Sequence, residues 1–219
     1  MVSVGIIDYG SGNLHSVHQA LLSLTDSVLV SDDPDALSRC DKLVLPGVGA
    51  YAACMDGLRE HRVDQFICDW VNDDNDLLGI CVGHQVLFSL GVEHGVDTEG
   101  LGLIPGTVTQ LNTARLPHMG WNRVDPPAGS VLFRGVEDQR FYFVHSYAAR
   151  DGEAAAIAAL EHQTRPVKIT FSEHGGDRFI AALECGRVFS TQFHPEKSGR
   201  AGLSLLSNWL DSSGINAER

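Results

Sequence analysis

The chain has 219 residues, of which 43% are hydrophobic and 20% are charged, a composition typical of a globular protein with one sizeable core. We therefore expect a single domain over residues 1–219. The formal net charge of −12 excludes nucleic acids and anionic membranes as main partners, because both attract clustered Lys and Arg. No apolar run reaches membrane-spanning length and the N-terminus lacks a basic signal region, so we expect a cytoplasmic protein.

Four short apolar runs in the first half are predicted to be buried strands, and helical patterns separate them. The strands are expected at Val4 to Asp8, Val28 to Ser31, Lys42 to Leu45 and Leu77 to Cys81. This alternation is typical of an α/β fold with a doubly wound, mostly parallel sheet and helices on both faces, as in flavodoxin-like proteins. Ligands of such sheets bind beyond the carboxyl ends of the strands.

Three of these strands run into loops suited to that edge of the sheet. The loops cover residues 8–13, 46–49 and 79–83, and each contains glycines that permit tight turns. Because the carboxyl ends of parallel strands meet at one edge, we expect all three loops to face one cleft.

The second half is richer in predicted strands. Arg140 to His145 and Arg187 to Gln192 are predicted to form an antiparallel extension of the sheet. Asp151 to Arg165 is rich in Ala and charged residues and is predicted to be a surface insertion. Gly202 to Leu210 carries leucines at i, i+3 and i+7, which predicts an amphipathic helix.

The segment Gly79–Gly83 has the form G-x-C-x-G between a predicted strand and the apolar pattern of Val86, Leu87 and Leu90, which predicts a helix. It matches a nucleophile elbow, whose glycines permit a strained turn that exposes the central side chain. A helix starting there favours the Cys81 thiolate at its positive end. A buried core cysteine is the alternative, and it is the reading we favour for the other four cysteines: Cys40, Cys54, Cys68 and Cys185.

The five cysteines are odd in number and show no C-x-x-C spacing, so neither a disulfide framework nor a zinc ribbon is indicated. His15 and His18 are spaced i, i+3, but no carboxylate or Cys follows at a matching spacing. We therefore expect no metal and no cofactor.

A thiolate nucleophile needs a base, and the base needs an orienting acceptor. His194 and Glu196 supply both in the sequence Phe193-His194-Pro195-Glu196, just past a predicted strand, with the proline fixing the backbone between them. By itself, H-P-E also fits an ordinary surface loop.

Acyl transfer also needs backbone donors for the developing oxyanion. The N–H of Val82, directly after the nucleophile, is the first candidate. The loop at residues 46–49, with Val48 and Gly49, is the candidate for the second, since its glycines let amides turn toward a ligand. The alternative is a simple strand-ending turn.

These residues resemble class I, or triad-type, glutamine amidotransferases, in which G-x-C-x-G-x-Q and H-P-E mark the nucleophile and its His-Glu partners. Within that group, four segments resemble the glutaminase subunits of imidazole glycerol phosphate synthase, a family of histidine biosynthesis. They are residues 44–50, 117–122 (P-H-M-G-W-N), 142–147 (Y-F-V-H-S-Y) and 191–199.

The resemblance implies that Cys81 attacks L-glutamine, releases ammonia and passes through a γ-glutamyl thioester. It also implies that Gln85 and the segment His145-Ser146-Tyr147 hold the glutamine, and that Gly49 belongs to the oxyanion loop.

The resemblance further implies a heterodimer with a (β/α)8-barrel cyclase subunit, which uses the ammonia to form imidazole glycerol phosphate and an aminoimidazole carboxamide ribotide. Asn13, Met119, Trp121 and Lys197 match family positions at the subunit interface. Direct transfer is physically reasonable, because ammonia released into neutral water mostly becomes non-nucleophilic ammonium. We also expect weak activity without the partner, because the Gly47 to Gly49 loop can rotate its amides.

One position departs from the family pattern: His84 stands where the family usually has Met. It is either a second titrating group near the nucleophile or a helix-surface residue that packs as Met would. Two other functions stay open, namely an amidotransferase serving another synthase (for pyridoxal phosphate, anthranilate or guanylate) and a noncatalytic regulatory subunit.

Overall fold

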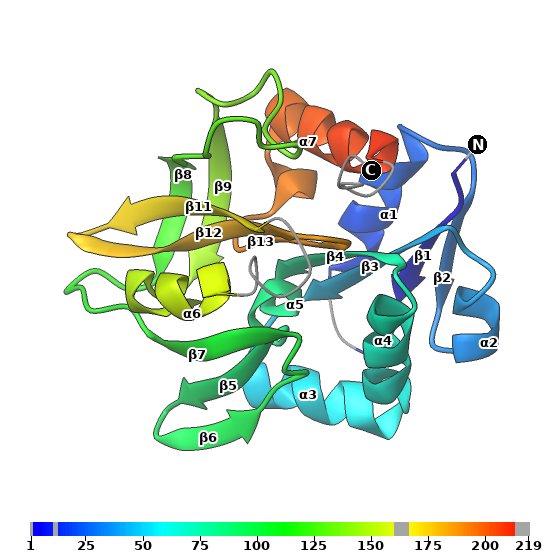
Figure 1. Cartoon of the computed structure of the whole chain (residues 1–219), viewed down its shortest axis with the longest axis horizontal. Helices are drawn as coiled ribbons and strands as arrows, with labels where there is room; N and C mark the ends of the chain where they lie inside the picture. The colour runs from blue at the N-terminus through cyan, green and yellow to red at the C-terminus, as the bar shows by residue number, and fades with distance from the viewer. Residues whose placement is uncertain (1, 11–12, 160–166, 213–219) are drawn as a thin grey trace.

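The computed structural model describes residues 2–10, 13–159 and 167–212, and a seven-stranded sheet forms its centre (Figure 1). The strand order is β11-β12-β13-β4-β3-β1-β2. The bounds are Val4–Ile7 (β1), Val28–Ser31 (β2), Lys42–Gly47 (β3), Asp76–Cys81 (β4), Val167–His174 (β11), Asp177–Cys185 (β12) and Val188–Thr191 (β13). The four strands predicted for the first half are all present.

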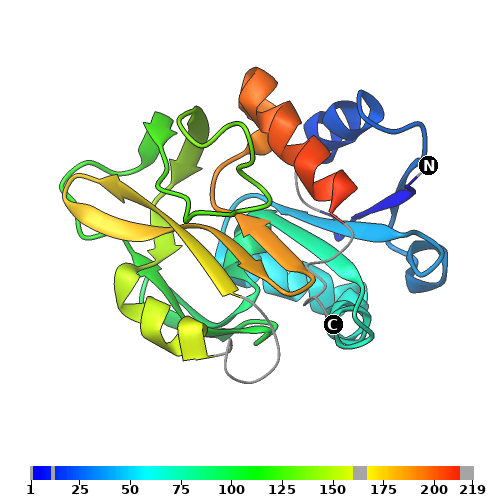
Figure 2. The same cartoon turned by 45° about the horizontal axis from the view of Figure 1, so that its top comes forward.

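Strands β2, β1, β3, β4 and β13 run parallel, whereas β12 and β11 are antiparallel to their neighbours. An antiparallel extension therefore exists, and Figure 2 shows it reaching away from the parallel strands. The prediction was wrong about its members. The segment that begins at Arg187 supplies β13, which is parallel to β4, and Arg140–His145 (β9) lies outside this sheet. Hydrophobic alternation identifies a strand but not its pairing partner.

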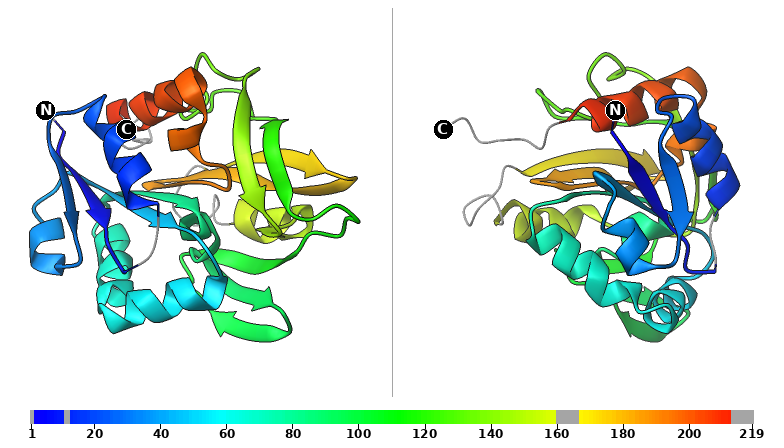
Figure 3. Two further views of the ribbon diagram at one scale, coloured as in Figure 1. Left: turned by 180° about the vertical axis from the view of Figure 1, so that it is seen from behind. Right: turned by 90° about the vertical axis from the view of Figure 1, so that its right-hand side faces the viewer.

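Helices cover both faces of the sheet, as Figures 1 and 3 show. Helices α1 (Leu14–Leu22) and α7 (Gly199–Asp211) lie on one face, and α3 (Tyr51–Glu60) and α4 (Val63–Asn72) lie on the other. Each buries an apolar stripe: in α4 the buried residues recur at helical spacing and include Val63, Ile67 and Trp70. The short α2 (Pro34–Leu37) begins at Asp33, whose side chain accepts from the Asp35 amide. The doubly wound α/β prediction is confirmed.

Two smaller sheets lie beside the central one. The first contains β10 (Tyr147–Ala149), β7 (Ile104–Gln110), β5 (Phe88–Glu93) and β6 (Val96–Glu99), and the second pairs β8 (His118–Arg123) with β9. The helix predicted from Val86, Leu87 and Leu90 is wrong, because helix α5 covers only Val82–Gln85 and Leu90 belongs to β5. A short apolar run fits a buried strand as well as a helix.

The predicted insertion at 151–165 is described only in part. It begins with the 3-10 helix η1 (Asp151–Glu153) and helix α6 (Ala154–Ala158), whose Ile157 side chain is fully buried. The first part of this segment therefore packs onto the protein, while residues 160–165 lie outside the described residues.

A buried ion pair connects the end of helix α7 to the first residues of strands β3 and β4. The Lys42 Nζ lies 2.7 Å from an oxygen of Asp76 and donates to the backbone oxygens of Trp209 and Ser212. Both charged side chains are about 95% buried, so each depends on the other for compensation. In the part of the chain that the structure describes, no helix is long and apolar enough to cross a membrane.

Candidate active site

Cys81 is the last residue of β4 and stands on a sharp strand-to-helix turn. Its φ of 58° is a conformation that non-glycine residues rarely adopt. The turn also requires Gly83, because a Cβ atom there would lie 1.9 Å from the carbonyl oxygen of Leu45. The strained backbone and the close packing beneath it hold the Cys81 side chain at the carboxyl edge of the sheet, as the elbow motif predicts.

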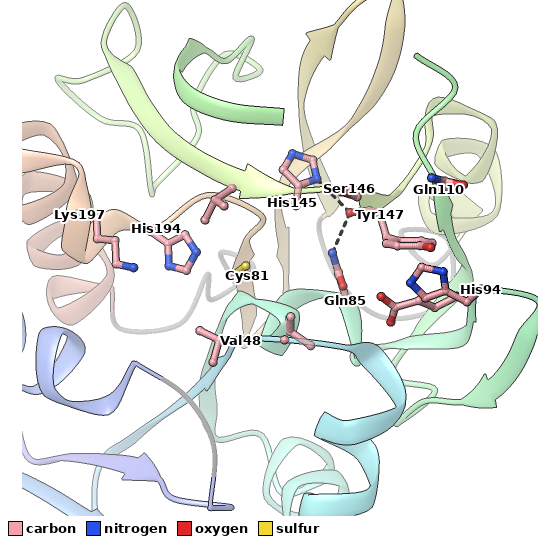
Figure 4. Close-up of a pocket in the computed structure, with 14 residues that line it drawn as sticks. Val48, Cys81, Gln85, His94, Gln110, His145, Ser146, Tyr147, His194 and Lys197 are labelled. Atoms are coloured by element: carbon pink, nitrogen blue, oxygen red, sulfur yellow. Dashed lines mark hydrogen bonds between the residues drawn. The ribbon is translucent and has the colours of Figure 1, made fainter. Parts of the chain in front are cut away.

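His194 and Glu196 lie at the same edge, around the 3-10 helix η3 (Pro195–Lys197). The Nδ1 of His194 lies 2.8 Å from Oε1 of Glu196, and both side chains are almost completely buried. Backbone contacts fix the loop, since the His194 amide donates to the Tyr142 carbonyl and the Ser198 hydroxyl donates to the His194 carbonyl. The imidazole is therefore held in one orientation, and Figure 4 shows it facing Cys81.

The surroundings of His194 favour its protonated form. Burial lowers the pKa of His194, but hydrogen bonding and charge interactions with Cys81 and Glu196 outweigh it and raise the pKa to about 10. The Cys81 sulfur and the Glu196 carboxyl are the groups that stabilise the imidazolium ion. The geometry thus places a protonated imidazole beside the candidate nucleophile, as nucleophilic catalysis requires.

A cavity of about 430 Å³ opens above Cys81 (Figure 4). Among the residues of the predicted site, its lining includes the following: Val48, Gly49, Cys81, Val82, Gln85, His145, Ser146, Tyr147, His194 and Lys197. The structure therefore brings the predicted nucleophile, base, oxyanion donors and substrate-binding residues to one cavity. Its size is within the usual range for small-molecule sites.

A row of amides connects the cavity wall to the nucleophile. The Gln85 Nε2 donates to the Tyr147 carbonyl at 2.8 Å and to Oε1 of Gln192 at 3.0 Å, and the Gln192 Nε2 lies 4.0 Å from the Cys81 sulfur. Gln192 was not among the residues predicted for the site. Its place two residues before His194, at the end of a strand leading into the H-P-E loop, was the available signal.

The residues predicted for the partner interface come from three separate parts of the chain. Met119 and Trp121 are 61% and 54% exposed on β8, which is unusual for large apolar side chains. Lys197 lines the cavity beside His194, and Asn13 precedes helix α1, where its side chain accepts a hydrogen bond from Ser16.

His84 occupies a different environment from either expectation. Its ring is fully buried, with Nδ1 2.7 Å from the Ser190 hydroxyl and an edge-to-face contact with Phe88, and it does not line the cavity. The helix-surface interpretation was therefore wrong. Burial lowers the pKa of His84 to about 3, so the ring is neutral at physiological pH and is not a second titrating group there.

The described residues contain no group of three or more His, Cys, Asp or Glu side chains arranged to hold a metal ion.

Comparison with known proteins decides the family. The model of the family described as glutamine amidotransferase class-I matches residues 5–212. The chain belongs to this family. Solved structures share the fold, including a chain described as glutamine amidotransferase (TM-score 0.69, 18% identity, covering 94% of this chain and 97% of that one). PurLQS from Thermotoga maritima gives a TM-score of 0.66 at 19% identity, covering 96% and 98% of the two chains.

Curated relatives are much more similar in sequence. The protein named imidazole glycerol phosphate synthase subunit HisH from Nocardia farcinica is 54% identical, with 96% of this chain and 98% of that protein covered. Proteins of the same name from Cutibacterium acnes and Mycobacterium tuberculosis are 52% and 50% identical, covering 96% and 95% of this chain and 97% of each relative. The chain therefore belongs to the family of imidazole glycerol phosphate synthase glutaminase subunits, and the resemblance inferred from the sequence motifs is confirmed.

Proposed function

We propose that this amidotransferase is the glutaminase subunit of an imidazole glycerol phosphate synthase, with Cys81, His194 and Glu196 as its catalytic triad. The observation that carries the proposal is the position of Cys81, on a strained elbow facing the His194 imidazole, which Cys81 and Glu196 together keep protonated. Relatives of that name, about half identical over nearly the full length, support the choice of synthase.

In the proposed reaction the Cys81 thiolate attacks the side-chain carbonyl of L-glutamine. The C–N bond breaks as His194 gives its proton to the leaving nitrogen, so ammonia departs and a γ-glutamyl thioester remains. His194, now neutral, takes a proton from water, which attacks the thioester and releases glutamate. Glu196 holds the ring by its Nδ1 throughout the reaction.

The oxyanion of each tetrahedral intermediate needs two donors. The Val82 amide follows the nucleophile at the start of α5, and Val48 and Gly49 line the same cavity, so we assign the oxyanion site to these residues. Gly49 has a φ of 87°, and a Cβ atom there would meet nothing within 4 Å, so this loop has room to turn its amides. We infer that glutamine itself is held by Gln85, His145, Ser146 and Tyr147, which form another wall of the cavity.

The proposed partner is a (β/α)8-barrel cyclase that receives the ammonia in a heterodimer and forms imidazole glycerol phosphate and the ribotide by-product. Met119 and Trp121 offer exposed apolar anchors of the kind that dominate protein interfaces, and Asn13 and Lys197 extend the proposed surface. We also propose that residues 1–219 form one amidotransferase domain, which the continuous apolar core of the described residues supports, and that the protein works in the cytoplasm.

The test is to replace Cys81 with Ala in the complex with the cyclase. We expect glutamine-dependent synthesis to be lost and synthesis from added ammonium to continue, because only the thiolate is removed. Cys68→Ala serves as a control, since that cysteine lies outside the cavity. Retained glutaminase activity in Cys81→Ala contradicts the triad, and activation of glutamine hydrolysis by another synthase but not by this cyclase contradicts the proposed partner.

A further inference from the structure

Two buried histidines form a hydrogen-bonded chain between β8 and β9. His118 and His145 are direct cross-strand partners, and Nδ1 of His118 lies 2.9 Å from Nε2 of His145. At one end, Nδ1 of His145 lies 2.9 Å from the Tyr147 carbonyl oxygen. At the other end, the Asn122 side-chain nitrogen lies 3.2 Å from Nε2 of His118.

This series of hydrogen bonds allows only one arrangement of protons on the two neutral imidazole rings. The Tyr147 carbonyl only accepts, so His145 carries its proton on Nδ1 and presents a lone pair at Nε2. That lone pair requires a donor, so His118 carries its proton on Nδ1 and accepts from Asn122 at Nε2. Moving the proton to the other nitrogen of either ring would place two donors or two lone pairs opposite each other.

The orientation of Asn122, on which this direction depends, is fixed independently. Its side-chain nitrogen also donates to the Glu173 carbonyl at 2.8 Å, and its side-chain oxygen accepts from the Arg123 amide at 2.8 Å. A flipped amide would lose both contacts, so Asn122 presents its NH₂ group to His118.

The surroundings keep both rings neutral. Burial, with a smaller contribution from neighbouring histidines, lowers the pKa of His145 to about 3 and that of His118 to about 4. The groups concerned are His174, which stacks on His118 with ring centres 4.2 Å apart, and His84 from helix α5. The single proton arrangement therefore persists at physiological pH.

The hydrogen-bonded series of His118 and His145 ends at the proposed glutamine site. The same Tyr147 carbonyl that accepts from His145 also accepts from Gln85, which leads through Gln192 to the Cys81 sulfur. If His145 reversed its tautomer, its Nδ1 lone pair would repel this carbonyl and move the strand that forms the cavity wall. Holding His145 in one tautomer therefore holds the Tyr147 carbonyl and the Gln85 amide in place.

We propose that His118 is a positioning residue of the glutamine site, whose Nδ1–H fixes the His145 tautomer and thereby the alignment of Tyr147 and Gln85. His118 itself does not line the cavity, and its action on substrate is indirect. The proposal rests on the proposed glutaminase function and adds a specific residue to substrate binding.

A matched pair of variants in the complex with the cyclase tests it. His118→Phe keeps the ring and its stacking but removes the donor, while His118→Asn places an amide NH₂ where Nδ1 stands but removes the ring. We expect His118→Phe to raise the KM for glutamine about tenfold, the cost of an unpaired buried polar group, with kcat within about twofold. His118→Asn should restore a KM close to that of the unchanged protein.

An unchanged KM in His118→Phe, or an equally raised KM in His118→Asn, overturns the proposal. Since the wild-type complex is assayed alongside, a wild type that hydrolyses glutamine separates this failure from failure of the proposed function. Nitrogen-15 NMR of the unchanged protein provides a measurement independent of how the variants fold. It should show protons on Nδ1 of both His118 and His145, and a proton on Nε2 of His145 would overturn the proposal.

Discussion

The buried His84 predicts a specific loss of stability in acid. In the unfolded chain a histidine has a pKa of about 6.5, whereas burial holds the pKa of His84 at about 3 in the folded protein. Between these values the unfolded state binds the extra proton and the folded state does not. The stability contribution is therefore complete above about pH 6.5 and falls as the pH is lowered toward 3.

The magnitude follows from linkage. At about pH 5 the unfolded side chain is largely protonated and the folded one is still neutral, so the loss is about 1.5 pH units times about 1.4 kcal/mol, or about 2 kcal/mol. This figure depends little on the folded pKa, because pH 5 lies well above it. Replacing His84 with Met removes the titrating group while retaining an apolar side chain of similar length beside Phe88.

The assay is urea unfolding of both proteins at about pH 7.5 and about pH 5. His84→Met should lose about 2 kcal/mol less between the two conditions. The cost of leaving the buried Ser190 hydroxyl without its partner is independent of pH and cancels in this difference, and the other buried histidines titrate in both proteins. His15→Met, at an exposed position on α1, should leave the pH dependence unchanged. Equal pH dependence in His84→Met and the unchanged protein would refute the reasoning.

Three further outcomes are expected. Gly83→Ala drives a Cβ atom into the Leu45 carbonyl, so we expect loss of cooperative thermal unfolding, and a folded, active variant would contradict the packing at the elbow. Glu196→Gln removes a charge that stabilises the His194 imidazolium, so the His194 pKa should fall below about 10 in an NMR titration, whereas an unchanged value would refute the pairing. Trp121→Ala should weaken cyclase binding about tenfold or more by calorimetry at unchanged melting temperature, and unaltered affinity would remove Trp121 from the interface.

The sequence predicted the strands well because their apolar runs are short and clearly bounded. Val28–Ser31 and Arg140–His145 match the predicted ranges, yet their neighbours in the sheets did not follow from the pattern. Pairing depends on contacts between segments far apart in the chain, which a local pattern does not contain. Leu90 was assigned to a helix because apolar residues at this spacing fit both structures.

The sequence predicted those residues of the candidate site whose type is fixed by the chemistry that they would perform. Cys81 and His194 lie in motifs whose glycines and proline have strict backbone requirements, and both line the predicted cavity. Gln192 and His118 escaped assignment because their contribution lies in hydrogen bonds that only the folded chain creates. For His84 the sequence left two interpretations open, a second titrating group or a helix-surface residue, because the local pattern does not contain its buried partner Ser190.

Strand β4 has a residue that stabilises the fold at its first position and the candidate nucleophile at its last. It begins at Asp76, in the buried pair with Lys42 that holds helix α7, and ends at Cys81, about 17 Å further along an extended strand. Stabilising substitutions near the beginning of the strand are thus remote from the strained turn at its end. A library aimed at thermostability can concentrate on the Lys42 end, where improved packing need not reduce turnover, and a library aimed at a new amide substrate can vary the other end from an already stabilised parent.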